Sequence, residues 1–174
     1  MIEDKLIDDL KSDIEYLRYE AESLHHVIEF VPYSEKPLDG ASIAEIFLSI
    51  DSIQVNILEV FKDLSRKGSD LDISEYDIFK NVELSSDQLI DHSIDDVISS
   101  IIKNRAYLIK DLSSKDSTFY EVEIQEEEKV ITIYELLKEM VKQERGLLGN
   151  IAELVMTYQT DRQFQRQLKS SSRK

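Results

Sequence analysis

The stretch SIAEIFLSIDSIQVNILEVFKDL, residues 42–64, decides the fold class. Its apolar residues recur mostly at spacings of three and four, so they share one face of an α-helix. These residues are Ile43, Ile46, Phe47, Ile50, Ile53, Ile57, Val60, Phe61 and Leu64. Ser42 and Glu45 form a capping box that marks where this helix begins, and Gly68 is the expected stop. The stretch therefore predicts a long helix that must bury one face against other elements.

Three further segments carry an apolar stripe of the same period. They span about residues 2–30, 85–112 and 133–155. Because four long stripes must bury against one another, the sequence predicts an all-α protein with an antiparallel four-helix bundle. The long connections on both sides of the third helix leave open an order other than simple up-down-up-down.

Between the third and fourth helices the apolar period changes to two. Phe119–Ile124 and Val130–Ile133 alternate apolar and polar residues, which predicts a small β-hairpin, with a charged extended loop as the alternative. Beyond the fourth helix, an amphipathic segment over about Thr160–Leu168 predicts a short C-terminal helix. We expect one domain over residues 1–168 and a basic, frayed tail over residues 169–174.

The composition argues against several classes of function. The 174-residue chain carries a formal charge of −15, which disfavours nucleic acids and anionic membranes as partners. It has no cysteine, which excludes disulfides, thiolate metal sites and cysteine nucleophiles. The first residues lack the pattern of a signal peptide, and no apolar stretch is long enough to span a bilayer. We therefore expect a cytoplasmic protein.

Two short segments resemble motifs of the DinB/YfiT-like metalloenzyme family. Residues 40–50, GASIAEIFLSI, are similar to its Trp-Ser-Ile-x-Glu-x-x-x-His-Leu motif and match it at Ser42, Ile43 and Glu45. Residues 143–151, QERGLLGNI, are similar to its His-Glu-x-x-His-x-Gly-Gln-Ile motif and match it at Glu144, Gly149 and Ile151. The resemblance implies a helical bundle, a homodimer that pairs through helical faces, and, in relatives, a divalent metal such as zinc or nickel.

The three positions of the family's metal-binding histidines carry Ser49, Gln143 and Leu147 in this sequence. In relatives, a His-x-x-x-His pair places two imidazoles on one helix face, and a histidine from a neighbouring helix completes the site. Serine and glutamine are weak neutral ligands, and leucine cannot bind a metal. We therefore expect no metal and no cofactor. Gln143 and Leu147 are expected to share a face with Leu136 and Met140.

Three charged residues are candidates to line the cleft that holds the metal in relatives: Glu45, Arg105 and Glu144. For Glu45, helix capping is the main interpretation. Arg105 interrupts the apolar face of the third helix, so it either meets an acidic ligand or pairs with a neighbouring carboxylate. For Glu144, a solvated position or an ion pair with Arg145 is the main interpretation.

The histidines His25, His26 and His92 are expected at the surface or its boundary. The leading functional hypothesis is a non-catalytic or diverged helical binding or structural module that has lost the family's metal site. One alternative is a metal-dependent thiol transferase or hydrolase whose atypical site uses a histidine with Glu45 or Glu144. Another is a protein that binds a small molecule in the vacated cleft.

Overall fold

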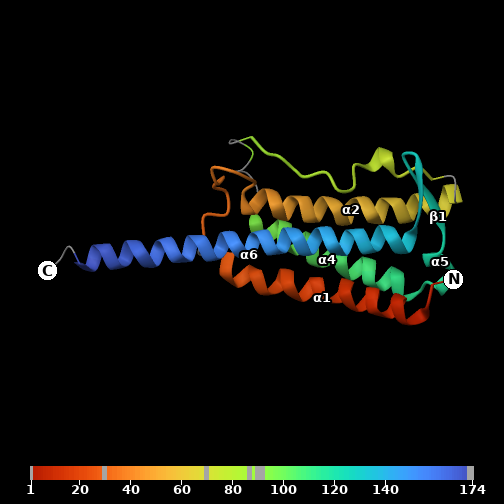
Figure 1. Cartoon of the computed structure of the whole chain (residues 1–174), viewed down its shortest axis with the longest axis horizontal. Coiled ribbons are helices and arrows are strands. Elements are labelled where there is room, and N and C mark those ends of the chain that lie inside the picture. The colour runs from red at the N-terminus through yellow and green to blue at the C-terminus, as the bar shows by residue number, and fades with distance from the viewer. Residues whose placement is uncertain (1, 29–30, 69–70, 86–87, 89–92, 172–174) are drawn as a thin grey trace.

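The computed structural model describes residues 2–28, 31–68, 71–85, 88 and 93–171. Most of these residues belong to four long helices (Figure 1). The long helices are α1 (Asp4–Ile28), α2 (Ile43–Lys67), α4 (Ile94–Ser113) and α6 (Ile133–Ser171). The smaller elements are the 3-10 turn η2 (Ser74–Tyr76), the short helix α5 (Ser117–Tyr120) and the antiparallel strands β1 (Glu123–Glu126) and β2 (Lys129–Thr132). The predictions of an all-α protein and of a small hairpin before the last long helix are confirmed.

The long helices pack in pairs. Helix α1 contacts α4 and α6, and α2 contacts the same two helices. Helices α1 and α6 run in one direction, and α2 and α4 run in the other (Figure 1). The antiparallel prediction is therefore correct for the pairs α1–α4 and α2–α6 and wrong for α1–α6 and α2–α4. The reason is that residues 71–85 return along the length of α2, so that α4 begins at the same end as α2.

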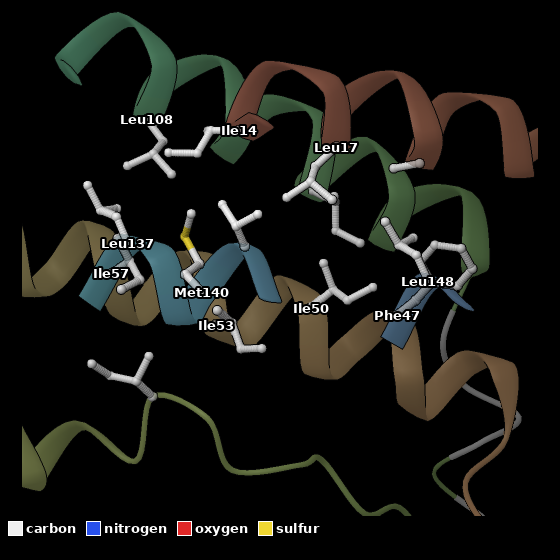
Figure 2. Close-up of a cluster of buried hydrophobic side chains, with 14 of the residues drawn as sticks. Ile14, Leu17, Phe47, Ile50, Ile53, Ile57, Leu108, Leu137, Met140 and Leu148 are labelled. Atoms are coloured by element: carbon white, nitrogen blue, oxygen red, sulfur yellow. The ribbon is translucent and has the colours of Figure 1, made fainter. Parts of the chain in front are cut away.

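One hydrophobic core joins all four long helices. Figure 2 shows apolar side chains from each of them pointing toward one another. The labelled residues are Ile14 and Leu17 of α1, Phe47, Ile50, Ile53 and Ile57 of α2, Leu108 of α4, and Leu137, Met140 and Leu148 of α6. Burial of one such side chain contributes roughly 1.5–3 kcal/mol, so this core is the main source of stability.

Two capping boxes begin α2 and α6, as predicted. In the first, the Ser42 N–H donates to Glu45 Oε2 at 2.9 Å, and the Glu45 N–H donates to Ser42 Oγ at 3.2 Å. In the second, Thr132 and Glu135 make the same two bonds at 2.8 Å and 3.2 Å. Gly68 ends α2 with a φ of 65°, a conformation that favours glycine.

One element boundary differs from the prediction, and another falls mostly outside the described residues. Helix α4 begins at Ile94, where the Ser93 hydroxyl accepts from the Asp96 N–H. The predicted beginning near residue 85 falls mostly on residues 86–87 and 89–92, which lie outside the described residues. Residues Phe119 and Tyr120 belong to α5 and not to a strand. Their helical turn follows from Asp116, whose carboxylate accepts from the Phe119 N–H at 3.2 Å and caps the turn.

The predicted short C-terminal helix is not a separate element. Helix α6 is continuous to Ser171, so it includes the first residues of the predicted tail. No glycine or proline, the two residues least favourable in a helix, follows Gly149. Residues 159–171, here called the arm, extend beyond the ends of the other helices (Figure 1). None of the described helices is long and apolar enough to cross a membrane.

Candidate functional site

Residues 71–85, here called the strap, connect the hairpin to the beginning of α2. At one end, the Ile73 N–H donates to the Gln125 carbonyl at 2.8 Å, and the Gln125 N–H donates to the Leu71 carbonyl at 2.9 Å. Leu71, Ile73 and Ile78 are buried, so the strap contributes to the core although it contains little regular structure. It therefore covers one side of α2 along much of its length.

Glu45 fixes the other end of the strap. Its Oε1 accepts from the Leu84 N–H at 2.8 Å and from Lys36 Nζ at 2.7 Å, while its Oε2 binds Ser42. Burial of this carboxyl raises its pKa, but the hydrogen bonds from Leu84, Lys36 and Ser42 outweigh burial and lower the pKa to about 2. Glu45 is thus a buried anion that joins the helix cap, the preceding loop and the strap.

Ser49 holds the strap one turn further along α2. Its hydroxyl donates to the Glu45 carbonyl at 2.8 Å and accepts from the Val82 N–H at 2.8 Å. The hydroxyl oxygen at the first predicted ligand position therefore already has two hydrogen bonds. A metal ion there would have to displace the strap.

A cleft of about 390 Å³ opens beside Ser49, between the beginning of α2, the loop before it, the strap and α6. Its lining residues are Pro37, Asp39, Gly40, Ala41, Ile46, Ser49, Asn81, Leu147, Asn150, Glu153, Leu154 and Thr157. Two of the three predicted ligand positions, Ser49 and Leu147, thus meet in one cleft. The lining residues that the structure describes include the acids Asp39 and Glu153 and no basic residue.

Gln143, the third predicted ligand position, is exposed and is not among the residues that line this cleft. Its side-chain amide donates to Glu139 Oε1 at 2.7 Å on the outer side of α6. The prediction that it shares the buried face of Leu136 and Met140 is wrong. Each residue turns an α-helix by about 100°, and the face that buries Met140 and Glu144 leaves Gln143 at its edge.

The polar residues inside the core form a separate cluster. Arg105 of α4, Glu144 of α6 and Gln54 of α2 are each 1% exposed. Arg105 forms an ion pair with Glu144 Oε2. The Gln54 amide satisfies both of its groups in one orientation, in which its oxygen accepts from Arg105 at 2.8 Å and its nitrogen donates to the Ile101 carbonyl at 2.9 Å. The cluster therefore ties three helices together.

The contacts in this cluster show which of the predicted partners Arg105 and Glu144 have. Arg105 pairs with a neighbouring carboxylate, which was one of its two alternatives. The prediction that Glu144 is solvated or pairs with Arg145 is wrong, because Arg145 pairs with Asp13 at 2.7 Å. Arg105, Glu144 and Glu45 are all buried, and none of the three is among the residues that line the cleft.

The charged pair of the cluster, Arg105 and Glu144, lies in the protein interior, away from solvent. Burial lowers the pKa of the Arg105 guanidinium to about 9, so the side chain stays charged at neutral pH. Within the described structure, Glu144 Oε1 is buried and has no hydrogen-bond partner. A buried carboxylate with an unsatisfied oxygen is costly, so this pair stabilises the fold only as long as both partners are present.

The two described histidines, His25 and His26, do not assemble with these acids. His25 Nε2 lies 2.9 Å from Asp95 Oδ1 and joins the end of α1 to the beginning of α4. His26 is exposed, and His92 lies outside the described residues. In the described ranges, no three His, Asp or Glu side chains gather so that they could hold a metal ion. The side chains at the three family positions therefore do not fit zinc or nickel: one is a bonded hydroxyl, one an exposed amide and one a hydrocarbon.

Comparisons of this chain with protein-family models, with curated proteins and with solved structures give no match. In the structure of the chain itself, the cleft beside Ser49 and Leu147 is open to a ligand, whereas the Arg105–Glu144 cluster is closed inside the core.

Proposed function

We propose that the chain is a non-catalytic, homodimeric binding module of the DinB/YfiT-like kind, with the corresponding four-helix bundle, and that its ligand occupies the cleft. The observation that carries this proposal is the meeting of Ser49 and Leu147 in one cleft of about 390 Å³. These are two positions at which relatives would bind a metal, and here neither side chain can act as a useful ligand. An apolar floor with a few polar groups around it is the usual composition of a small-molecule site.

The lining favours a small organic cation. Ile46, Leu147 and Leu154 offer hydrocarbon surface, while the carboxylates of Asp39 and Glu153 supply negative charge. With no basic residue among the described lining residues, an anionic ligand would meet two acidic side chains and no compensating cation. A primary ammonium group on a short alkyl chain matches both features, because its charge binds the acids and its chain covers the floor.

Titration calorimetry with n-hexylammonium, and with hexanoate as the matched anion, tests the ligand class. We expect hexylammonium to bind and hexanoate not to bind. Glu153→Gln is expected to weaken hexylammonium binding by about three- to fivefold, since an exposed charge contributes roughly 0.5–1 kcal/mol. Glu128→Gln, which removes an exposed carboxylate in the hairpin turn, is the control and is expected to leave the affinity unchanged. Equal binding of the anion, or equal loss in the control, would contradict the proposal.

Elemental analysis distinguishes this function from a metal-dependent transferase or hydrolase. After incubation with zinc and nickel and removal of loosely bound ions, we expect no stoichiometric metal, because neither Ser49 nor Leu147 offers a free donor. One tightly bound metal per chain would overturn the non-catalytic proposal and favour the alternative, a metal-dependent thiol transferase or hydrolase with an atypical site.

A further inference from the structure

The arm is an exposed part of α6. Exposed side chains occur at residues 159–163, 165 and 166. Figure 1 shows that the arm extends beyond the ends of the other helices. Its 13 residues span about 20 Å at the rise of an α-helix. Most of the stability of helices in proteins comes from tertiary packing, so the arm is more stable when another surface covers it.

The charge of the arm is opposite to that of the rest of the chain. The arm contains three basic residues and one acidic residue, a net charge of +2, and residues 172–174 of the sequence add two more basic residues, which gives +4 over residues 160–174. The whole chain carries −15, so residues 1–159 carry −19. The most complementary surface for the arm is therefore the body of another copy of this chain. A nucleic acid would meet the arm favourably and the remaining surface unfavourably.

The basic residues of the arm occupy a defined face. Val155, Tyr158, Arg162 and Arg166 follow one another at spacings of three and four, so they form one line along α6. Val155 is buried and Tyr158 is half-buried, whereas Arg162 and Arg166 are exposed. The helix face that is apolar inside the body thus becomes basic where the body ends.

An acidic surface with exposed apolar residues lies at the root of the arm. The loop before α2 presents Glu35 and Asp39 on either side of Leu38, whose exposed fraction of 105% is unusual for a leucine. Glu153 and the 67% exposed Met156 of α6 lie at the same end, since Asp39 and Glu153 line one cleft. We call these five residues the docking surface. The arm of the same chain points away from it along the straight axis of α6 (Figure 1).

We propose that the arm of one copy lies across the docking surface of a second copy, and that the arm of the second copy lies across the docking surface of the first. In this twofold exchange, Arg162 and Arg166 of each copy face Glu35 and Asp39 of the other, while Leu38 and Met156 become covered. The exchange rests on the homodimer proposed above, for which it gives the interface, and it does not require the ligand proposed for the cleft, although Asp39 and Glu153 contribute to both surfaces.

A charge-swap experiment tests the exchange on the full chain by sedimentation velocity. Wild type is expected to be a dimer in low salt and to shift toward monomer at about 1 M NaCl, where screening reaches within about 3 Å. The arm variant Arg162→Glu/Arg166→Glu and the loop variant Glu35→Lys/Asp39→Lys should each be monomeric. Mixed one to one, they should form a heterodimer, because both of its contacts then join opposite charges.

The control reverses two exposed charges on α4, Lys103→Glu/Lys110→Glu, and should remain dimeric. Circular dichroism should show unchanged helix content in all variants. A monomeric wild type, dimers in both single-sided variants, or failure of the mixture to associate would each overturn the exchange. Hexylammonium titrated into the monomeric arm variant separates the two proposals, because unchanged binding there leaves the cleft proposal intact whatever the assembly result.

Discussion

Arg105→Met is expected to lower the free energy of unfolding by about 3–5 kcal/mol, because it leaves Glu144 as an uncompensated charge inside the core. For a chain of this length the melting temperature should fall by roughly 6–20 °C. Urea unfolding at pH 7, followed by circular dichroism, measures the change. The expected loss of stability is large because the side chains of Arg105 and Glu144 are each only 1% exposed.

The double variant Arg105→Met/Glu144→Leu should recover most of this loss and lie within about 2 kcal/mol of wild type. Removing both charges also removes the unsatisfied Glu144 Oε1. Arg145→Met is the matched control, since it breaks an ion pair with Asp13 whose two side chains are each 45% exposed, and it should cost less than about 1 kcal/mol. If Arg105→Met cost no more than this control, the cluster would be open to water and not part of a dry core.

Glu45→Gln is expected to lower the free energy of unfolding by about 3 kcal/mol at pH 7. The native pKa of about 2 lies below the ordinary value of 4.5, so ionised Glu45 stabilises the folded state. This contribution is complete above about pH 4.5 and is lost as the pH falls toward 2. The difference between wild type and variant should therefore shrink between pH 4.5 and pH 2, as measured by urea unfolding across that range.

The second capping box provides a matched control for this prediction. Glu135 occupies the same position in the box of α6, but its side chain is exposed and no strap contacts it. Glu135→Gln should therefore cost less than about 1 kcal/mol. Equal losses in the two variants would show that capping alone accounts for the effect and that the bonds from Leu84 and Lys36 contribute nothing.

Much of the fold is readable from the sequence because it depends on local patterns. A capping box requires only four consecutive residues, which is why the beginnings of α2 and α6 were predictable from Ser42 and Thr132. The continuity of α6 was harder to predict because the apolar stripe ends near Val155, as it does at many helix ends. Residues 156–171 nevertheless continue the helix to Ser171, because they contain no glycine or proline and include several good helix formers, such as glutamine, arginine and leucine.

The site was less predictable because it depends on how distant segments meet. No local pattern indicates that the Val82 and Leu84 amides return to Ser49 and Glu45, since this follows from the path of the strap. The pairing of Arg105 with Glu144 was also not predicted, although one feature of the sequence points to it. Glu144 follows the core residue Met140 by one helical turn, and a carboxylate at such a position suggests a buried partner for an arginine that interrupts another apolar stripe.

Because α6 is one uninterrupted helix, a small rotation of its buried part produces a larger displacement at its far end. Its 39 residues extend about 58 Å from the hairpin, through the core, past the cleft and into the arm. A helix is stiff along its axis, so a tilt of about 5° around the core would displace the far end of the arm by about 3 Å over roughly 40 Å. Any tilt of α6 at the cleft would therefore also displace the arm, because both belong to one uninterrupted helix.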